Sequence, residues 1–185
     1  MRVEFHRTGK RRYAVRIIRE DLPDLEMNPA PGFDALMPHD LLHFLVESEL
    51  NLKHAIFGQV ATGENTGNFL TKPSEDSNTR ADSRFRRKES KQRKKIIKNN
   101  IDEYLQSERA TIICMYDWLA HSADENLLKR AAEMEDTAQS VQGQMTEIEK
   151  QKLDKQKLAR IRKRMDELSA RWSALKVNES MIVEW

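Results

Sequence analysis

Four side chains that can bind a metal ion share one face of a helix predicted over residues 39–50. At about 100° per residue, His39, His43, Glu47 and Asp40 fall near 0°, 40°, 80° and 100°, and the rest of the helix is mostly apolar. Two imidazoles at positions i and i+4 can converge on one ion, and neighbouring carboxylates can act as ligand, hydrogen-bonding partner or base. The pattern predicts a site for zinc or iron.

The same four residues have a simpler interpretation. A helix packed on a core needs one polar face, and His39, His43 and Glu47 could line that face in water. Asp40 could act only on the helix dipole, because it lies in the first turn after Pro38. The two interpretations differ in the spatial neighbours that they expect around the two imidazole rings.

A second pair of candidate ligands has the same spacing. Asp117 and His121 stand four residues apart on a helix predicted over residues 101–121. If that helix packs over the first one, both pairs of residues could form a shared site. The alternative is a solvated helical pair with no ligand.

The His-Asp-x-x-His sequence at residues 39–43 resembles the metal motif of the coenzyme Q biosynthesis scaffold proteins. In that family a Glu follows after eleven residues, and Ala55 stands at this position here. A longer resemblance is to small uncharacterised bacterial proteins that share His-Asp-Leu-x-His-Phe-x-Val-Glu at residues 39–47. They also share a glycine-bearing helix like residues 52–58 and a terminal Trp-x-x-Leu, here residues 172–175, before a Val-rich strand. This resemblance implies a layout of elements and implies no activity.

A strongly basic segment, residues 80–98, interrupts a chain that is otherwise slightly acidic. It holds ten basic and two acidic residues, a net charge of +8, whereas residues 1–79 and 99–185 each carry −3. Such a segment can hold the phosphates of a nucleic acid or another anionic surface. It can equally be a solvated linker, since only Phe85 offers a ring for base stacking. The candidate anion-binding residues are Arg84, Arg86, Arg87, Lys88, Arg93, Lys94 and Lys95.

The two ends of the chain are expected to meet in a small antiparallel sheet. Alternating apolar residues on either side of a turn at residues 8–10 predict a β-hairpin over residues 1–20. An isolated hairpin is marginal in water, so a further strand predicted over residues 177–185 should join it. Residues 22–38 hold four of the five prolines and are predicted to be a connector.

The second half of the chain is predicted to be almost entirely helical. Cap motifs delimit helices over residues 101–121 and 123–138, and a third is expected from 141 to 175 after a turn weakened by Gly143. At about 50 Å, the third helix should project and pack antiparallel against the first of them. Its apolar seam consists of Leu158, Ile161, Met165, Leu168, Trp172 and Leu175.

These elements predict a mostly helical α+β fold. Residues 1–62, completed by strand 177–185, carry the hairpin and the His-Asp-x-x-His helix. Residues 63–98 are predicted to be a linker with the basic segment, and residues 99–176 a long antiparallel helical hairpin or coiled coil.

The composition excludes several classes of protein. The net charge is only +2 in 185 residues, which argues against a globally basic nucleic-acid binder. No apolar run approaches the roughly 18 residues of a membrane span, and the first residues lack the apolar core of a signal peptide. The single cysteine, Cys114, excludes an internal disulfide and favours a reducing, cytoplasmic location.

Three functions are compatible with this sequence. The first is a metal-binding or protein-interaction module, with the helical hairpin as the surface for a protein partner. The second is a metal-dependent enzyme, such as a hydrolase, in which Glu47 or Asp40 acts as general base. The third is a nucleic-acid-associated protein that binds through residues 80–98.

Overall fold

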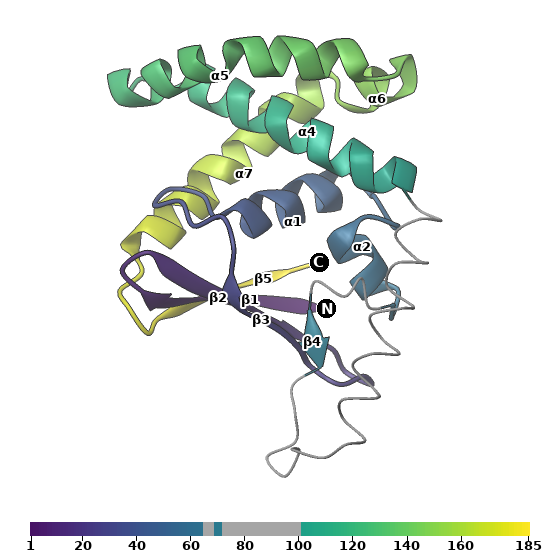
Figure 1. Cartoon of the computed structure of the whole chain (residues 1–185), viewed down its shortest axis with the longest axis vertical. Helices are drawn as coiled ribbons and strands as arrows, with labels where there is room; N and C mark the ends of the chain where they lie inside the picture. Colours follow the sequence, from purple (N-terminus) through teal and green to yellow (C-terminus); the bar gives the residue numbers. More distant parts are fainter. Residues whose placement is uncertain (65–68, 72–100) are drawn as a thin grey trace.

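A five-stranded antiparallel sheet joins the two ends of the chain in the computed structural model, which describes residues 1–64, 69–71 and 101–185 (Figure 1). The strand order is β4-β3-β2-β1-β5. The bounds are β1 Arg2–Gly9, β2 Arg12–Ile18, β3 Leu25–Ala30, β4 Leu70–Thr71 and β5 Ser180–Glu184. The predicted hairpin is therefore confirmed, and the strand predicted over residues 177–185 joins it as β5, which pairs with β1.

Apolar and polar residues alternate along these strands because helices cover only one face of the sheet. Val3 and Phe5 of β1 and Val15 and Ile17 of β2 have no exposed surface, whereas most of their neighbours in sequence are at least partly exposed, with the buried Ala14 as the exception. Met181 of β5 continues the same buried face.

The connector predicted over residues 22–38 is wrong in part, because it contains β3. This strand pairs with β2 on one side and, through Leu25 and Glu26, with β4 on the other. Pro29 stands beyond the residues that pair with β4, where its missing N–H interrupts no bond to that strand. Pairing with the two neighbouring strands therefore stabilises β3, and no local apolar pattern predicts it.

Six helices cover the sheet within the described ranges. They are α1 His39–Leu50, α2 Ile56–Ala61, α4 Ile101–Ala120, α5 Glu125–Gln144, α6 Glu147–Lys152 and α7 Lys155–Ala174. The bounds of α1 match the predicted helix. Figure 1 shows α1 between the sheet and α4, with α5 as the outermost layer.

The single helix predicted over residues 141–175 is wrong. Helix α5 continues through Gly143 to Gln144, and the chain then breaks twice before α7 begins. Thr146 and Glu149 form a reciprocal capping box that starts α6, and the side chain of Asp154 caps α7. Each cap satisfies helix-end N–H groups and so makes a new start more favourable than one continuous helix.

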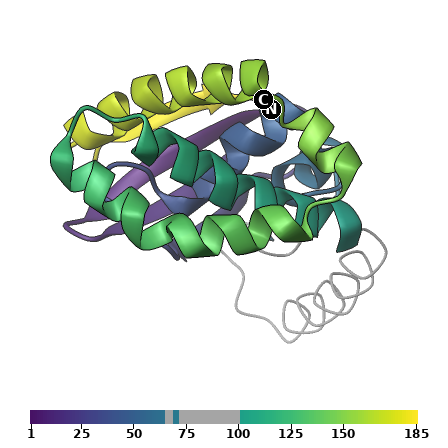
Figure 2. The same ribbon diagram turned by 90° about the horizontal axis from the view of Figure 1, so that it is seen from above.

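The helical hairpin is therefore formed by α4 and α5, which lie side by side in Figure 2 and are joined by residues 121–124. The side chain of Asp124 caps α5, so this helix begins at Glu125 and not at the predicted residue 123. Helix α7 contacts both α1 and α4, and the middle of its apolar seam, from Ile161 to Trp172, is buried in the core of the fold, with Leu158 and Leu175 partly buried at the ends. No helix in the described ranges combines the length and apolar character that crossing a membrane requires.

Candidate metal centre

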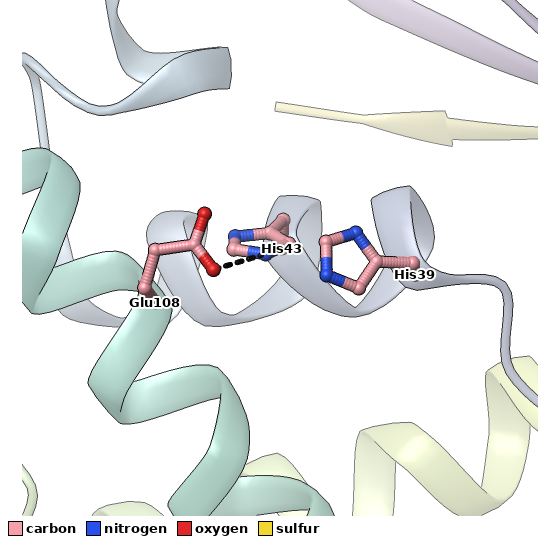
Figure 3. A group of neighbouring side chains, drawn as sticks. All are labelled: His39, His43 and Glu108. Atoms are coloured by element: carbon pink, nitrogen blue, oxygen red, sulfur yellow. Dashed lines mark ion pairs between the residues drawn. The ribbon is translucent and has the colours of Figure 1, made fainter. Parts of the chain in front are cut away.

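Two adjacent helices bring three potential metal ligands together. His39 and His43 lie one turn apart on α1, and Glu108 reaches them from α4 (Figure 3). One ligand atom from each residue lies within 4.8 Å of the other two. The ring of His43 lies between the other two side chains, with its centroid 4.5 Å from that of His39.

His43 is fully buried and its two ring nitrogens have different surroundings. Nδ1 lies 2.9 Å from the Ser107 hydroxyl oxygen and 3.4 Å from that of Thr111. Nε2 is buried and has no hydrogen-bonding partner among the described residues. It lies 3.6 Å from Oε2 of Glu108, whose side chain is 37% exposed. An unpartnered buried nitrogen is costly unless a proton or another ligand occupies its lone pair.

His39 is held at the edge of this group by the loop that precedes α1. Its backbone N–H donates to the carbonyl oxygen of Gly32, which has a positive φ of 68°. A Cβ atom at Gly32 would lie 2.6 Å from Cβ of His39. Glycine at this position therefore allows the loop to pack directly against the base of the imidazole side chain.

The two histidines have pKa values shifted in opposite directions. Burial of the His43 ring lowers its pKa, but hydrogen bonding and negative charge from Glu47, with further charge from Glu108 and Asp40, raise the pKa by more. The pKa of His43 is therefore above its ordinary value. Desolvation and the neighbouring His43 lower the pKa of His39, so His39 is the readily available neutral imidazole of the pair.

Glu47, which shares the predicted ligand face, is directed away from the group and into the core. Its carboxylate has no exposed surface and accepts hydrogen bonds from the backbone N–H groups of Ile56, Phe57 and Gly58. The Ser107 hydroxyl donates to its Oε1 at 2.8 Å. Glu47 thus anchors the start of α2 and stands behind His43, with Ser107 between them.

Asp40 is also committed elsewhere. It accepts a hydrogen bond from the hydroxyl of Tyr13 on β2, and desolvation raises its pKa. The same contact and burial raise the pKa of Tyr13. Of the four residues of the predicted ligand face, the two histidines therefore lie close to Glu108. The two carboxylates, Asp40 and Glu47, are hydrogen-bonded to other groups.

Asp117 and His121 are not part of this group in the described ranges. Asp117 is paired with Arg162 of α7, with Nε 2.9 Å from Oδ2. His121 is half exposed, and its Nδ1 lies 2.8 Å from the backbone oxygen of Asp117. Asp117 therefore forms an ion pair near the end of α4, and His121 lies half exposed to solvent just after it.

Sequence reasoning missed Ser107 and Glu108. A signal was present, because Ser107, Ala110, Thr111 and Cys114 place small side chains at helical spacing along α4. All four are buried, and such a face lets a second helix approach closely. Polar side chains on this face or next to it, such as Ser107 and Glu108, can therefore contact side chains of the helix packed against α4.

The predicted anion-binding residues between 80 and 98 lie outside the described residues. Comparison with protein-family models, curated proteins and solved structures found no match for this chain.

Proposed function

We propose that this protein binds a divalent transition-metal ion through His39, His43 and Glu108. The observation that carries the proposal is the buried Nε2 of His43, which has no hydrogen-bonding partner among the described residues and faces a carboxylate and a second imidazole. A cation between these three groups would satisfy that lone pair and neutralise Glu108.

The donor set favours zinc or ferrous iron over magnesium or calcium. Two imidazoles and one carboxylate are typical of zinc and non-haem iron sites, whereas magnesium and calcium take oxygen ligands. A tetrahedral zinc ion would bring its ligand atoms to roughly 3.4 Å from one another. The ligand atoms now lie up to 4.8 Å apart, so the side chains would have to move slightly closer together to bind the ion. The exposed His39 and the partly exposed Glu108 have room for this movement.

Metal binding is supported better than hydrolysis. Three protein ligands would leave a coordination position open, as in catalytic zinc sites. However, both carboxylates considered as general bases are hydrogen-bonded to other groups, Glu47 to α2 and Asp40 to Tyr13. Two cavities of about 480 and 290 Å³ lie beside Arg19 and Glu20 and are lined by none of the three ligands. Neither of these two cavities therefore serves as a substrate pocket around the proposed site.

Equilibrium dialysis against Zn²⁺ followed by elemental analysis tests the proposal on protein that carries no histidine tag. We expect about one zinc ion per chain for the wild type. His43→Ala and Glu108→Gln should each raise the dissociation constant by at least about tenfold. The Glu108→Gln variant is the more informative, because this partly exposed side chain can be changed without opening the core.

His121→Ala is the matched control, since it removes a histidine that has the same helical spacing from a neighbour but lies outside the group. It should bind zinc like the wild type. A zinc content below about a tenth per chain in the wild type would overturn the proposal. Equal affinity in wild type and Glu108→Gln would remove Glu108 from the ligand set and overturn the assignment.

A further inference from the structure

A buried hydroxyl bridges the Glu47 carboxylate and the His43 ring, whose Nδ1 also lies 3.8 Å from Oε1 of Glu47 directly. Oγ of Ser107 lies 2.8 Å from Oε1 of Glu47 and 2.9 Å from Nδ1 of His43. Glu47 and His43 have no exposed surface and Ser107 is 1% exposed, so water does not separate these groups. A hydroxyl has one proton to donate, so only one of its two neighbours can receive it.

The direction of this donation follows from the surroundings of Glu47. Three backbone N–H groups, from Ile56, Phe57 and Gly58, already donate to its two oxygens. Both oxygens of Glu47 are therefore already used as acceptors. Ser107 therefore donates its proton to Glu47 and offers a lone pair to His43, whose Nδ1 must then be the donor.

We infer that Glu47, acting through Ser107, holds neutral His43 in the tautomer that carries its proton on Nδ1 and leaves Nε2 free to bind a metal ion. Only the binding of a metal ion at Nε2 rests on the proposed function; the tautomer of His43 does not depend on it. Ser107 and Glu47 are positioning residues, since neither belongs to the group of three potential ligands. An acceptor behind a metal-bound imidazole fixes the orientation of the ring and raises the basicity of the ligand nitrogen.

A second hydroxyl provides a matched comparison. Oγ1 of Thr111 lies 3.4 Å from the same Nδ1, a longer contact than that of Ser107. Thr111→Val removes this hydroxyl at nearly constant shape, and Ser107→Ala removes the bridge to Glu47. If the bridge sets the tautomer, only Ser107→Ala should change it.

The test is nitrogen-15 NMR of the histidine rings in the metal-free protein, at a pH above the pKa of His43. In the wild type and in Thr111→Val, we expect Nδ1 of His43 to be protonated and Nε2 to be bare. In Ser107→Ala, the population of His43 rings should move toward the form protonated on Nε2. The N–H at Nε2 can then donate to the carboxylate of Glu108, whose Oε2 lies 3.6 Å away. A wild-type ring protonated on Nε2 overturns the inference, and this result needs no variant to fold. An unchanged tautomer in folded Ser107→Ala overturns it as well.

Zinc titration of the same three proteins separates this inference from the proposed function. Ser107→Ala should raise the zinc dissociation constant by about 10- to 100-fold, and Thr111→Val should leave it within about twofold of the wild type. A wild type that has the Nδ1-protonated ring and binds no zinc overturns the proposed function and supports the tautomer. Equal zinc affinity in wild type and Ser107→Ala overturns the positioning role and leaves the metal site standing.

Discussion

His43 and His121 each stand one helical turn from another potential ligand, His39 on α1 and Asp117 on α4. The ring of His43 is buried between two helices, with one nitrogen on Ser107 and the other without a hydrogen-bonding partner in the described ranges. The ring of His121 is half exposed at the end of α4, and its nitrogen is bonded to its own helix.

The difference shows that spacing on a helix is a weak predictor of a metal site. The i,i+4 relation is the same in both pairs, but Asp117 is already paired with Arg162, whereas no Lys or Arg of the described residues forms an ion pair with Glu108. Burial then makes an unoccupied lone pair costly in one place and harmless in the other. The buried pair also has a supporting group, Glu47, that the exposed pair lacks.

Removal of that supporting group should have the largest effect on stability. Glu47→Ala leaves three backbone N–H groups and the Ser107 hydroxyl without their acceptor in the core. We expect a loss of at least about 3 kcal/mol in the free energy of unfolding, measured by urea denaturation. Glu49→Ala on the same helix removes only the partly exposed pair with Arg164 and should cost about 1 kcal/mol or less. Similar losses in the two variants would show that Glu47 is not the anchor described here.

Gly32→Ala should have the next largest effect and act on the proposed metal site directly. The new Cβ would lie 2.6 Å from Cβ of His39, at a φ that side-chain-bearing residues rarely adopt. We expect a stability loss of about 2 kcal/mol and at least about tenfold weaker zinc binding, because His39 must move.

Gly143→Ala is the control for that substitution. It lies in α5, where a Cβ would meet nothing within 4 Å, so it should raise stability by up to about 1 kcal/mol and leave zinc binding unchanged. Unaltered zinc affinity in Gly32→Ala would show that the loop does not position His39.

Zinc affinity should fall as the pH falls. The raised pKa of His43 means that a proton competes for Nε2 at a higher pH than for an ordinary histidine, whereas the lowered pKa of His39 delays competition there. Below the pKa of His43, one displaced proton predicts an affinity loss of about tenfold per pH unit. Competition titrations with a chelator of known affinity between about pH 8 and pH 5.5 measure this slope. A flat profile over that range would argue against an imidazole ligand.

The smallest effects are expected at the exposed pair. His121→Ala should change the free energy of unfolding by less than about 1 kcal/mol, because its ring is half exposed at a helix end, and Asp117→Asn should cost about 1 kcal/mol through its ion pair with Arg162. Neither substitution should alter zinc affinity. A loss of zinc in His121→Ala would erase the distinction between the two pairs and restore a site shared by α1 and α4.

Much of the fold could be predicted from local patterns. The hairpin, the strand Ser180–Glu184 and the helix His39–Leu50 have apolar periodicities that match their backbone repeat. Strand β3 could not be predicted in this way, because pairing with β2 and β4 overrides a proline-rich sequence. The break between α5 and α7 was readable from Thr146-x-x-Glu149, a cap motif that the apolar seam obscured.

The sequence by itself determined that the two histidines share one face of α1, since i and i+4 positions lie together on any α-helix. Only the tertiary structure decided that Glu108 joins them and that Glu47 does not. Ser107 is separated from His43 by 64 residues, and no local rule brings such residues into contact. Close packing of α4 on α1 removed water from His43 and left Nε2 facing Glu108, and that desolvation turns a common helical pair into a candidate metal centre.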